Sequence, residues 1–248
     1  MFAIFKKELR SYFINAIGYV FVGVFLAVAA LLCCYTTLGV KSYDTSLYFT
    51  AMIISFIILI PLLTMKLFAE EKKLRTEQLL LTAPVSIWGI VLGKFLAAST
   101  LFVGTVLVSC INFIPMYIYA NSERLADEYG VTYIGPMTGE IITCIVGIIL
   151  IGLAFIAIGM FVSSLTENQL AAAVITIAII LLMLILDMLK QYIDVYAIRF
   201  VINWVCVMSR FSNFTQGILD YASMLYYFSI SGVFLLLTVR VYDRRRWG

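Results

Sequence analysis

Residues that carry enzymatic chemistry are scarce in this 248-residue sequence, which contains no histidine. A Ser/His/Asp triad, an H-E-x-x-H zinc site and a haem held by histidine all need that residue, so these three kinds of site are excluded. The five cysteines are odd in number and form no C-x-x-C pair, which indicates neither a disulfide framework nor a metal site. We therefore expect a chain that is not an enzyme and binds no cofactor or metal.

One stretch approaches a nucleotide-binding motif. Gly89 to Lys94 reads GIVLGK, whereas a P-loop has four residues between its glycines and a hydroxyl residue after its lysine. Here three residues separate the glycines, and Phe95 follows the lysine. The same Gly89 and Gly93 form a G-x-x-x-G pattern, which in a membrane helix more often marks close helix packing. Any ATP that this protein uses must therefore be hydrolysed by another chain.

The densest group of charges lies in Glu70 to Thr82, which reads EEKKLRTEQLLLT. In a helix, Leu74 and Leu81 fall on one side, and Glu70 and Glu77 fall on another. This pattern predicts a short helix outside the membrane over 70–82. A solvated loop whose charges only enforce topology stays open as the alternative.

Pro84 ends that helix, because the residue before a proline avoids the helical region. Ser86 can then cap the next helix, and Lys94 would extend its side chain back to the membrane surface. A loop that only enforces topology needs charges alone. This stretch also has a compact helix, a proline that ends it and a cap for the next helix. We interpret the segment as a docking element for a partner.

The elements that position this segment are membrane spans. The chain is 63% hydrophobic and 12% charged, with a mean hydropathy of +1.06, whereas soluble domains are about 25% charged. Six stretches of 19 to 30 residues contain no Asp, Glu, Lys or Arg, and a helix needs about 20 residues to cross the hydrocarbon core. The sequence predicts a single all-α transmembrane domain over 1–248 with spans at 17–38, 47–68, 89–119, 139–165, 168–188 and 222–241.

The basic residues predict the orientation of these spans. If both termini are cytoplasmic, 12 of the 17 basic residues lie inside and five lie outside, which fits the positive-inside rule. The five are Lys41, Arg124, Lys190, Arg199 and Arg210. The basic balance therefore reports orientation, and we expect no nucleic-acid partner.

Two further segments outside the spans have recognisable patterns. Phe2, Phe5, Leu9 and Tyr12 recur at helical spacing, which predicts an amphipathic helix over 1–14 on the inner membrane surface. A basic flank that only orients the first span is the alternative. Outside, the stretch 189–220 is too interrupted to span and predicts interfacial or re-entrant short helices.

Polar residues within the spans are few, and none of them is charged near the middle of a span. Proton-coupled pumps and ion-coupled carriers usually place charges there, so an ion-coupled carrier is disfavoured. Asn112 with Pro115 is a candidate helix break. Small polar residues could line a pathway, although burial against neighbouring helices is the more common role; they are Ser55, Thr64, Ser99, Ser109 and Asn112.

Several blocks of the sequence then point to a family. EEKKLRTEQLLLTAPVS (Glu70 to Ser86) followed by VLGKF (Val91 to Phe95) is similar to E-E-K-R-x-G-T-x-E-L-L-L-T-x-P-V-S followed by V-L-G-K-F in permease subunits of type-2 ATP-binding-cassette (ABC-2) transporters. GLAFIAIGMFVSSLTENQLAAAVIT (Gly152 to Thr176) and FLLLTVRVYDRRRW (Phe234 to Trp247) also resemble that family. The resemblance covers nearly the whole chain and is strongest to the branch of the gliding-motility permease and the permease of nitrous-oxide reductase maturation.

The resemblance implies that 70–82 is the coupling helix, which docks on a separate ATPase subunit, and that 1–14 is the elbow helix. The family often has glycine where this chain has Arg75 and glutamate where it has Gln78. ATP and Mg would be bound by the ATPase subunit, and a second permease chain, identical or paralogous, would complete the pathway. The implied coupling residues are Glu70, Glu71, Lys72, Lys73, Arg75, Thr76, Glu77, Gln78 and Leu80.

The function that follows is export. We expect the permease subunit of an ATP-driven exporter in the bacterial cytoplasmic membrane, in contact with membrane lipid and moving a lipid-like, peptide or other amphipathic substrate. The alternative is an ATPase-coupled assembly or signalling scaffold that moves no cargo.

Overall fold

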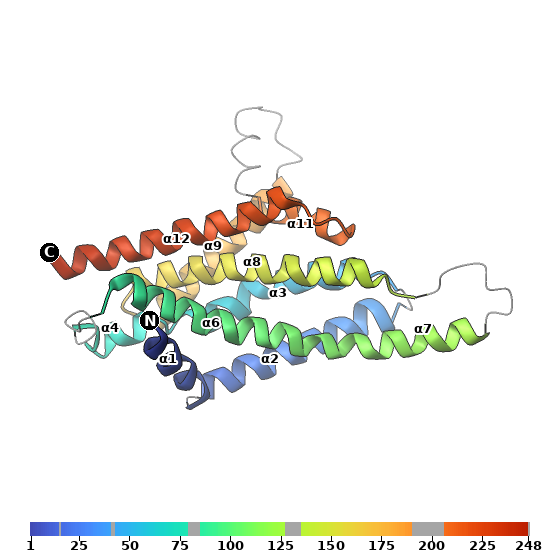
Figure 1. Cartoon of the computed structure of the whole chain (residues 1–248), viewed down its shortest axis with the longest axis horizontal. Coiled ribbons are helices and arrows are strands. Elements are labelled where there is room, and N and C mark those ends of the chain that lie inside the picture. The colour runs from blue at the N-terminus through green and yellow to red at the C-terminus, as the bar shows by residue number, and fades with distance from the viewer. Residues whose placement is uncertain (15, 41–42, 79–84, 127–134, 190–205, 248) are drawn as a thin grey trace.

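The computed structural model describes residues 1–14, 16–40, 43–78, 85–126, 135–189 and 206–247. Within these ranges all regular structure is helical, and the long helices run side by side in one bundle (Figure 1). Six helical stretches are long and apolar enough to cross a membrane: Ala16–Leu38, Ser46–Lys73, Ile87–Asn121, Thr138–Leu165, Gln169–Leu189 and Tyr221–Arg246. The predicted all-α fold with six spans is confirmed.

The first half of the chain begins with α1 (Phe2–Ile14) and α2 (Ala16–Cys33), which continues as a π-helix over Cys34–Leu38. Then come α3 (Ser46–Thr64), α4 (Ala69–Lys73) and α6 (Ile87–Ser109), a 3₁₀ turn over Cys110–Phe113 and α7 (Ile114–Ala126). The second half consists of α8 (Thr138–Leu165), α9 (Gln169–Leu189), α11 (Met208–Thr215) and α12 (Tyr221–Trp247). The predicted outer stretch 189–220 therefore contains the short helix α11, while 190–205 lies outside the described residues.

Helix α8 is the centre of the bundle. It packs against α3, α6, α9, α11 and α12. Of its most apolar stretch of 18 residues, 72% is buried. Two glycines allow this close approach, because a Cβ at Gly152 would lie 2.1 Å from Cζ of Phe102, and one at Gly159 would lie 2.3 Å from Oγ1 of Thr64. Any larger residue there would have to displace α6 or α3.

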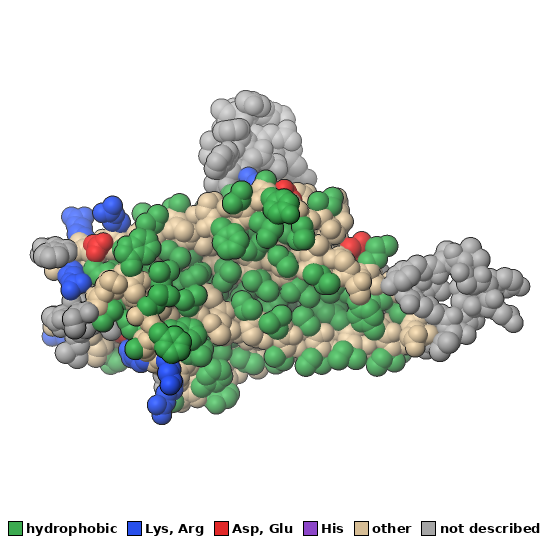
Figure 2. Space-filling model, in the orientation of Figure 1, with side chains coloured by type: hydrophobic (Ala, Val, Ile, Leu, Met, Phe, Trp, Pro, Cys, Tyr) green, Lys and Arg blue, Asp and Glu red, His purple; other side chains and the backbone are tan. Residues whose placement is uncertain are grey.

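Both chain termini and α4 lie at one end of the bundle, which we call the terminal end (Figure 1). Figure 2 shows Lys and Arg side chains gathered at this end, whereas hydrophobic side chains cover the flank of the bundle. This separation is typical of a multi-pass membrane protein, because charged side chains leave the apolar belt. That the terminal end faces the cytoplasm stays a prediction from the positive-inside rule.

Helix α1 packs across α6 and against α2 at the terminal end. The predicted helix is present, and its side chains Phe5, Leu9 and Tyr12 turn toward the bundle, whereas Phe2 is 76% exposed. That α1 lies on the inner membrane surface stays a prediction. The Tyr12 hydroxyl donates a hydrogen bond to the carbonyl oxygen of Leu63, at 3.2 Å. Helix α1 is thereby attached directly to the end of α3.

Two spans depart from α-helical geometry at neighbouring positions. The π-helix Cys34–Leu38 of the first span lies beside the 3₁₀ turn Cys110–Phe113 of the third, where Sγ of Cys33 contacts the carbonyl oxygen of Asn112 at 3.4 Å. At the candidate break near Asn112 the chain forms this 3₁₀ turn, but the stretch from Ile87 to Asn121 stays helical.

Candidate functional site

The candidate site is the segment Ala69–Gln78, which we call the docking segment. It follows α3 at the terminal end and begins with α4, the five-residue helix Ala69–Lys73. The chain then turns over Leu74–Thr76 and is helical again at Glu77 and Gln78. The prediction of one continuous helix over 70–82 is therefore wrong for its first part. Residues 79–82 of the predicted helix, which include the coupling candidate Leu80, lie outside the described residues.

Arg75 is the physical reason for the interruption. Its φ angle is 57°, in the left-handed region that costs a non-glycine residue about 1–2 kcal/mol. The Arg75 amide donates to the carbonyl of Lys72, and the Thr76 amide donates to the carbonyl of Glu71, each at 3.0 Å. These two bonds form a Schellman motif, whose left-handed position is usually glycine. The ABC-2 pattern often has glycine where this chain has Arg75, but no turn was predicted there from the sequence.

Arg75→Gly therefore tests the turn. We expect it to raise the free energy of unfolding by about 1 kcal/mol relative to Arg75→Ala, since glycine adopts the left-handed conformation without a Cβ clash. Thermal unfolding of the two purified variants measures the difference. Equal midpoints would contradict the left-handed geometry.

The side chains of the docking segment divide into an outward and an inward set. Lys73, Leu74, Arg75, Thr76 and Gln78 are exposed, and Leu74 is 64% exposed although it is apolar. Glu70 is half-buried and lies 4.0 Å from Nζ of Lys66. The exposed set forms a cationic surface with one apolar side chain, which suits contact with a protein partner.

The inward set attaches the segment to the rest of the chain. Glu71 pairs with Lys94 of α6, Lys72 donates to the carbonyl oxygen of Ser164, and Glu77 lies 3.1 Å from Nη1 of Arg245 in α12. These three coupling candidates therefore contact helices of their own chain.

Ser163 of α8 holds the beginning of α4. Its Oγ accepts hydrogen bonds from the backbone amides of Phe68 and Ala69, both at 3.1 Å, and donates to the carbonyl oxygen of Met65 at 3.2 Å. Helix N-termini leave their first amides without intrahelical partners, so this serine acts as a cap supplied by another helix. Its bond to the Met65 carbonyl also joins α8 to the chain directly after α3, which ends at Thr64.

A buried group of charges, which we call the Lys94 cluster, joins α1, α4 and α6. It consists of Lys7, Glu8, Glu71 and Lys94. Nζ of Lys94 lies 3.2 Å from Oε1 of Glu8 and 2.9 Å from Oε1 of Glu71, and donates to the carbonyl oxygen of Leu67 at 2.7 Å. It also lies 5.0 Å from the centre of the Phe68 ring.

The prediction that Lys94 extends to the membrane surface is wrong, since its side chain is only 1% exposed. Three oxygens satisfy its three N–H donors inside the protein, and α1 covers the route to the surface. Sequence reasoning missed Glu8, which lies 86 residues from Lys94 in the chain.

Lys7 completes the cluster at its exposed edge, 3.3 Å from Glu8 and 3.5 Å from Glu71. Partial burial lowers the pKa of the Lys7 ammonium, but the two carboxylates outweigh it and hold this pKa above its ordinary value. Lys7 is therefore a full positive charge at neutral pH. Oε2 of Glu71 is buried and has no hydrogen-bond partner among the described residues.

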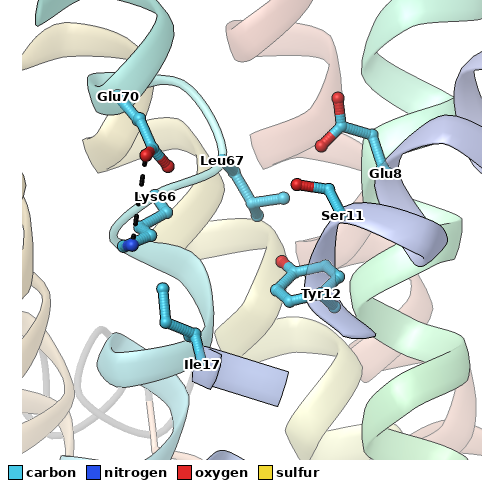
Figure 3. Close-up of a pocket in the computed structure, with 7 residues that line it drawn as sticks. All are labelled: Glu8, Ser11, Tyr12, Ile17, Lys66, Leu67 and Glu70. Carbon is cyan, nitrogen blue, oxygen red and sulfur yellow. Dashed lines mark ion pairs between the residues drawn. The ribbon is translucent and has the colours of Figure 1, made fainter. Parts of the chain in front are cut away.

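A small polar pocket of about 40 Å³ lies beside the cluster, between α1 and the turn from α3 to α4. Figure 3 shows Glu8 and Glu70 on opposite sides of it, with Tyr12 below Ser11 on the α1 side. Its volume suits a few water molecules, since each needs about 10–15 Å³. Glu8 lines this pocket and also belongs to the Lys94 cluster, so the pocket and the cluster adjoin each other.

Helix α12 supplies the last attachment. The Tyr242 ring lies 4.7 Å from the Phe68 ring, and the guanidinium of Arg245 lies 5.7 Å from the centre of the Tyr242 ring. Arg246 donates to the carbonyl oxygen of Val85 at 3.4 Å. The docking segment is thus held by α1, α6, α8 and α12.

The candidate pathway residues are spread along two spans. Ser55 and Thr64 are nine residues apart in α3 and donate to the carbonyls of Met52 and Ile60 of their own helix. Ser99 and Ser109 of α6 are buried, and Asn112 is half-buried. The structure does not bring these five side chains together, and a pathway role stays a prediction.

A comparison with protein-family models bears on this arrangement. Residues 35–241 match the model described as ABC-2 family transporter protein, and the match covers most of the chain. The chain belongs to the ABC-2 transporter family. No curated protein matches it closely enough to add a more specific name. The ABC-2 chain is therefore a multi-pass membrane component of a transport system, and the resemblance to ABC-2 permeases read from the sequence is confirmed at the level of the family.

Proposed function

We propose that this ABC-2 chain is the permease subunit of an ATP-driven exporter, and that a separate ATPase subunit docks on the docking segment. The observation that carries the proposal is the cationic turn Lys73–Thr76, exposed at the terminal end and attached to four helices of the bundle. A surface so attached can pass movement of a bound partner to the spans.

Family membership supports an ATPase partner, because ABC-2 permeases typically pair with one. The GIVLGK stretch also supports it, since its Gly89 and Gly93 lie in α6, where a Cβ at Gly93 would approach Ile4 of α1 to 3.1 Å. These glycines serve helix packing. ATP and Mg are then bound by the partner ATPase subunit. The chain itself spans the bacterial cytoplasmic membrane, and its terminal end faces the cytoplasm.

A second permease chain belongs to the proposal, because one six-span chain has no second half to enclose a pathway. The substrate class is lipid-like, peptide or amphipathic, in keeping with spans that carry no charge at mid-membrane. The EEKKLRTEQLLLTAPVS block supports membership of the branch that includes the gliding-motility and nitrous-oxide-reductase-maturation permeases.

The test is purification of the tagged chain from its native membrane in mild detergent, followed by mass spectrometry. We expect a stoichiometric partner with a complete P-loop motif. Lys73→Glu with Arg75→Glu should reduce recovery of that partner at least tenfold, because both charges of the exposed turn are reversed.

The matched control is Arg240→Glu with Arg244→Glu, which makes the same charge change on exposed positions of α12. It should retain the partner. A chain that purifies alone, or a partner that survives reversal of the turn, would overturn the proposal. A complex that hydrolyses ATP but moves none of a lipid and peptide panel would favour the scaffold.

A further inference from the structure

The outward face of α1 is a surface that the docking function does not use. Lys6, Lys7 and Arg10 are exposed on it and border a shallow groove of about 560 Å³, which Ala3, Ser11 and Ile14 also line. Positions 6, 7 and 10 share one side of a helix. The only acidic residue of α1, Glu8, turns inward to Lys94, so the groove carries positive charge alone.

Apolar side chains flank these cations. Phe2, Phe13 and Ile14 are 76%, 44% and 70% exposed, at the two ends of the same helix. A helix that presents apolar side chains beside Lys and Arg lies in the interface of a membrane, where the apolar groups enter the acyl region and the cations reach phosphates. Such a face favours lipid over a soluble anion, because a soluble anion would leave the three apolar side chains in water.

We propose that the groove on α1 binds anionic phospholipid headgroups of the surrounding membrane, and that this binding fixes the position of the docking segment. Lys6 and Arg10 hold the phosphate, and Ala3 and Ile14 contact the acyl chain. The second half of this inference rests on the proposed function, whereas the first half concerns the chain alone.

The headgroup must be anionic for a reason of charge. Each Lys or Arg near an anionic bilayer surface contributes about 1 kcal/mol of attraction, while zwitterionic lipid has no net charge to attract. Three cations without an exposed acid on α1 therefore discriminate phosphatidylglycerol from phosphatidylcholine.

Lys7 connects the groove to the docking segment. Its side chain is 60% exposed on the groove, yet Nζ lies 3.5 Å from Oε1 of Glu71 in α4. On the inner face of the same helix, Glu8 shares Lys94 with Glu71. Lipid that restrains α1 therefore restrains α4 through both charges, and ATPase coupling should increase in anionic membranes.

The first experiment measures lipid binding by the purified full chain in detergent, by native mass spectrometry with phosphatidylglycerol or phosphatidylcholine. The chain should retain phosphatidylglycerol preferentially. Lys6→Gln with Arg10→Gln should weaken that binding about 30-fold, from two lost cations at about 1 kcal/mol each. Arg240→Gln with Arg244→Gln removes the same charge from α12 and should retain the preference. Equal binding by the α1 variant, or an equal loss in the α12 control, would overturn the groove as a site.

The second experiment measures ATP hydrolysis by the complex with its ATPase subunit in nanodiscs of phosphatidylcholine with and without phosphatidylglycerol. The parent complex should be stimulated by phosphatidylglycerol, and the α1 variant should lose that stimulation while the α12 control keeps it. Lipid binding without any effect on ATPase activity would overturn the link to the docking segment. Absence of an ATPase subunit altogether would overturn the proposed function, and the groove would still be decided by the first experiment.

Discussion

Lys94→Met is expected to cost about 3–5 kcal/mol of unfolding free energy and to abolish stimulation of the partner ATPase. The substitution keeps the volume of the side chain but leaves the carboxylates of Glu8 and Glu71 without the ammonium that lies between them. Lys7 at the exposed edge then remains as the one ammonium for two carboxylates, so one largely buried negative charge is left uncompensated, which is the reason for the large cost. Thermal unfolding of the purified chain in detergent should show a midpoint lower by about 10 °C.

Two variants separate this cause from a general loss of packing. Lys66→Met removes a lysine from the same end, but one that pairs only loosely with Glu70 at 4.0 Å, so its cost should stay below about 1 kcal/mol. Adding Glu8→Gln and Glu71→Gln to Lys94→Met removes the excess negative charge and should recover part of the lost midpoint, since Lys7 is 60% exposed and can be solvated without these partners. In a chain of this size, a change in the melting midpoint of about 2 °C corresponds to no more than about 1 kcal/mol. A Lys94→Met protein that melts this close to the parent would show that the cluster contributes no stability.

Ser163→Ala is the second substitution with a large expected effect, about 2–4 kcal/mol. It leaves the amides of Phe68 and Ala69 buried without their acceptor, and each such loss costs about 1–3 kcal/mol. The beginning of α4 should then separate from α8. Trypsin should cleave faster after Lys73 and Arg75, which mass spectrometry of the digest measures.

The neighbouring Ser164 provides the matched control. It is equally buried, but its Oγ donates only to the carbonyl of Phe161 in its own helix, at 2.6 Å. Ser164→Ala should therefore change stability by less than about 0.5 kcal/mol and leave the cleavage rate unchanged. Equal effects of the two alanine substitutions would mean that the cap on α4 contributes nothing.

The spans were predictable from sequence because the membrane imposes a strict rule on single segments. A charge near mid-membrane is costly, so runs without charge report span number directly. Helix capping was also predictable, because the two groups that it joins are close in the sequence. The Ser86 side chain accepts a hydrogen bond from the Gly89 amide, three residues away.

The candidate site was less predictable, because its contacts join residues far apart in the chain. Helical periodicity placed Glu70 and Glu77 on the polar side of one helix, but Arg245 of α12 pairs with Glu77, and Lys94 of α6 pairs with the neighbouring Glu71. The rule that lysine extends to the membrane surface fails at Lys94, because it assumes lipid around the side chain and α1 lies there instead. A left-handed residue at Arg75 is likewise invisible to periodicity.

The ion pair between Glu77 and Arg245 has a consequence for biosynthesis. These residues are 168 positions apart, so the ribosome must add 168 residues after Glu77 before Arg245 is present. At about 5–20 residues per second, the docking segment waits about 10 seconds or more after its own synthesis before this contact can form. The surface offered to a partner therefore matures only after α12 has been synthesised, so that a chain truncated before Arg245 presents this surface without its contact to α12.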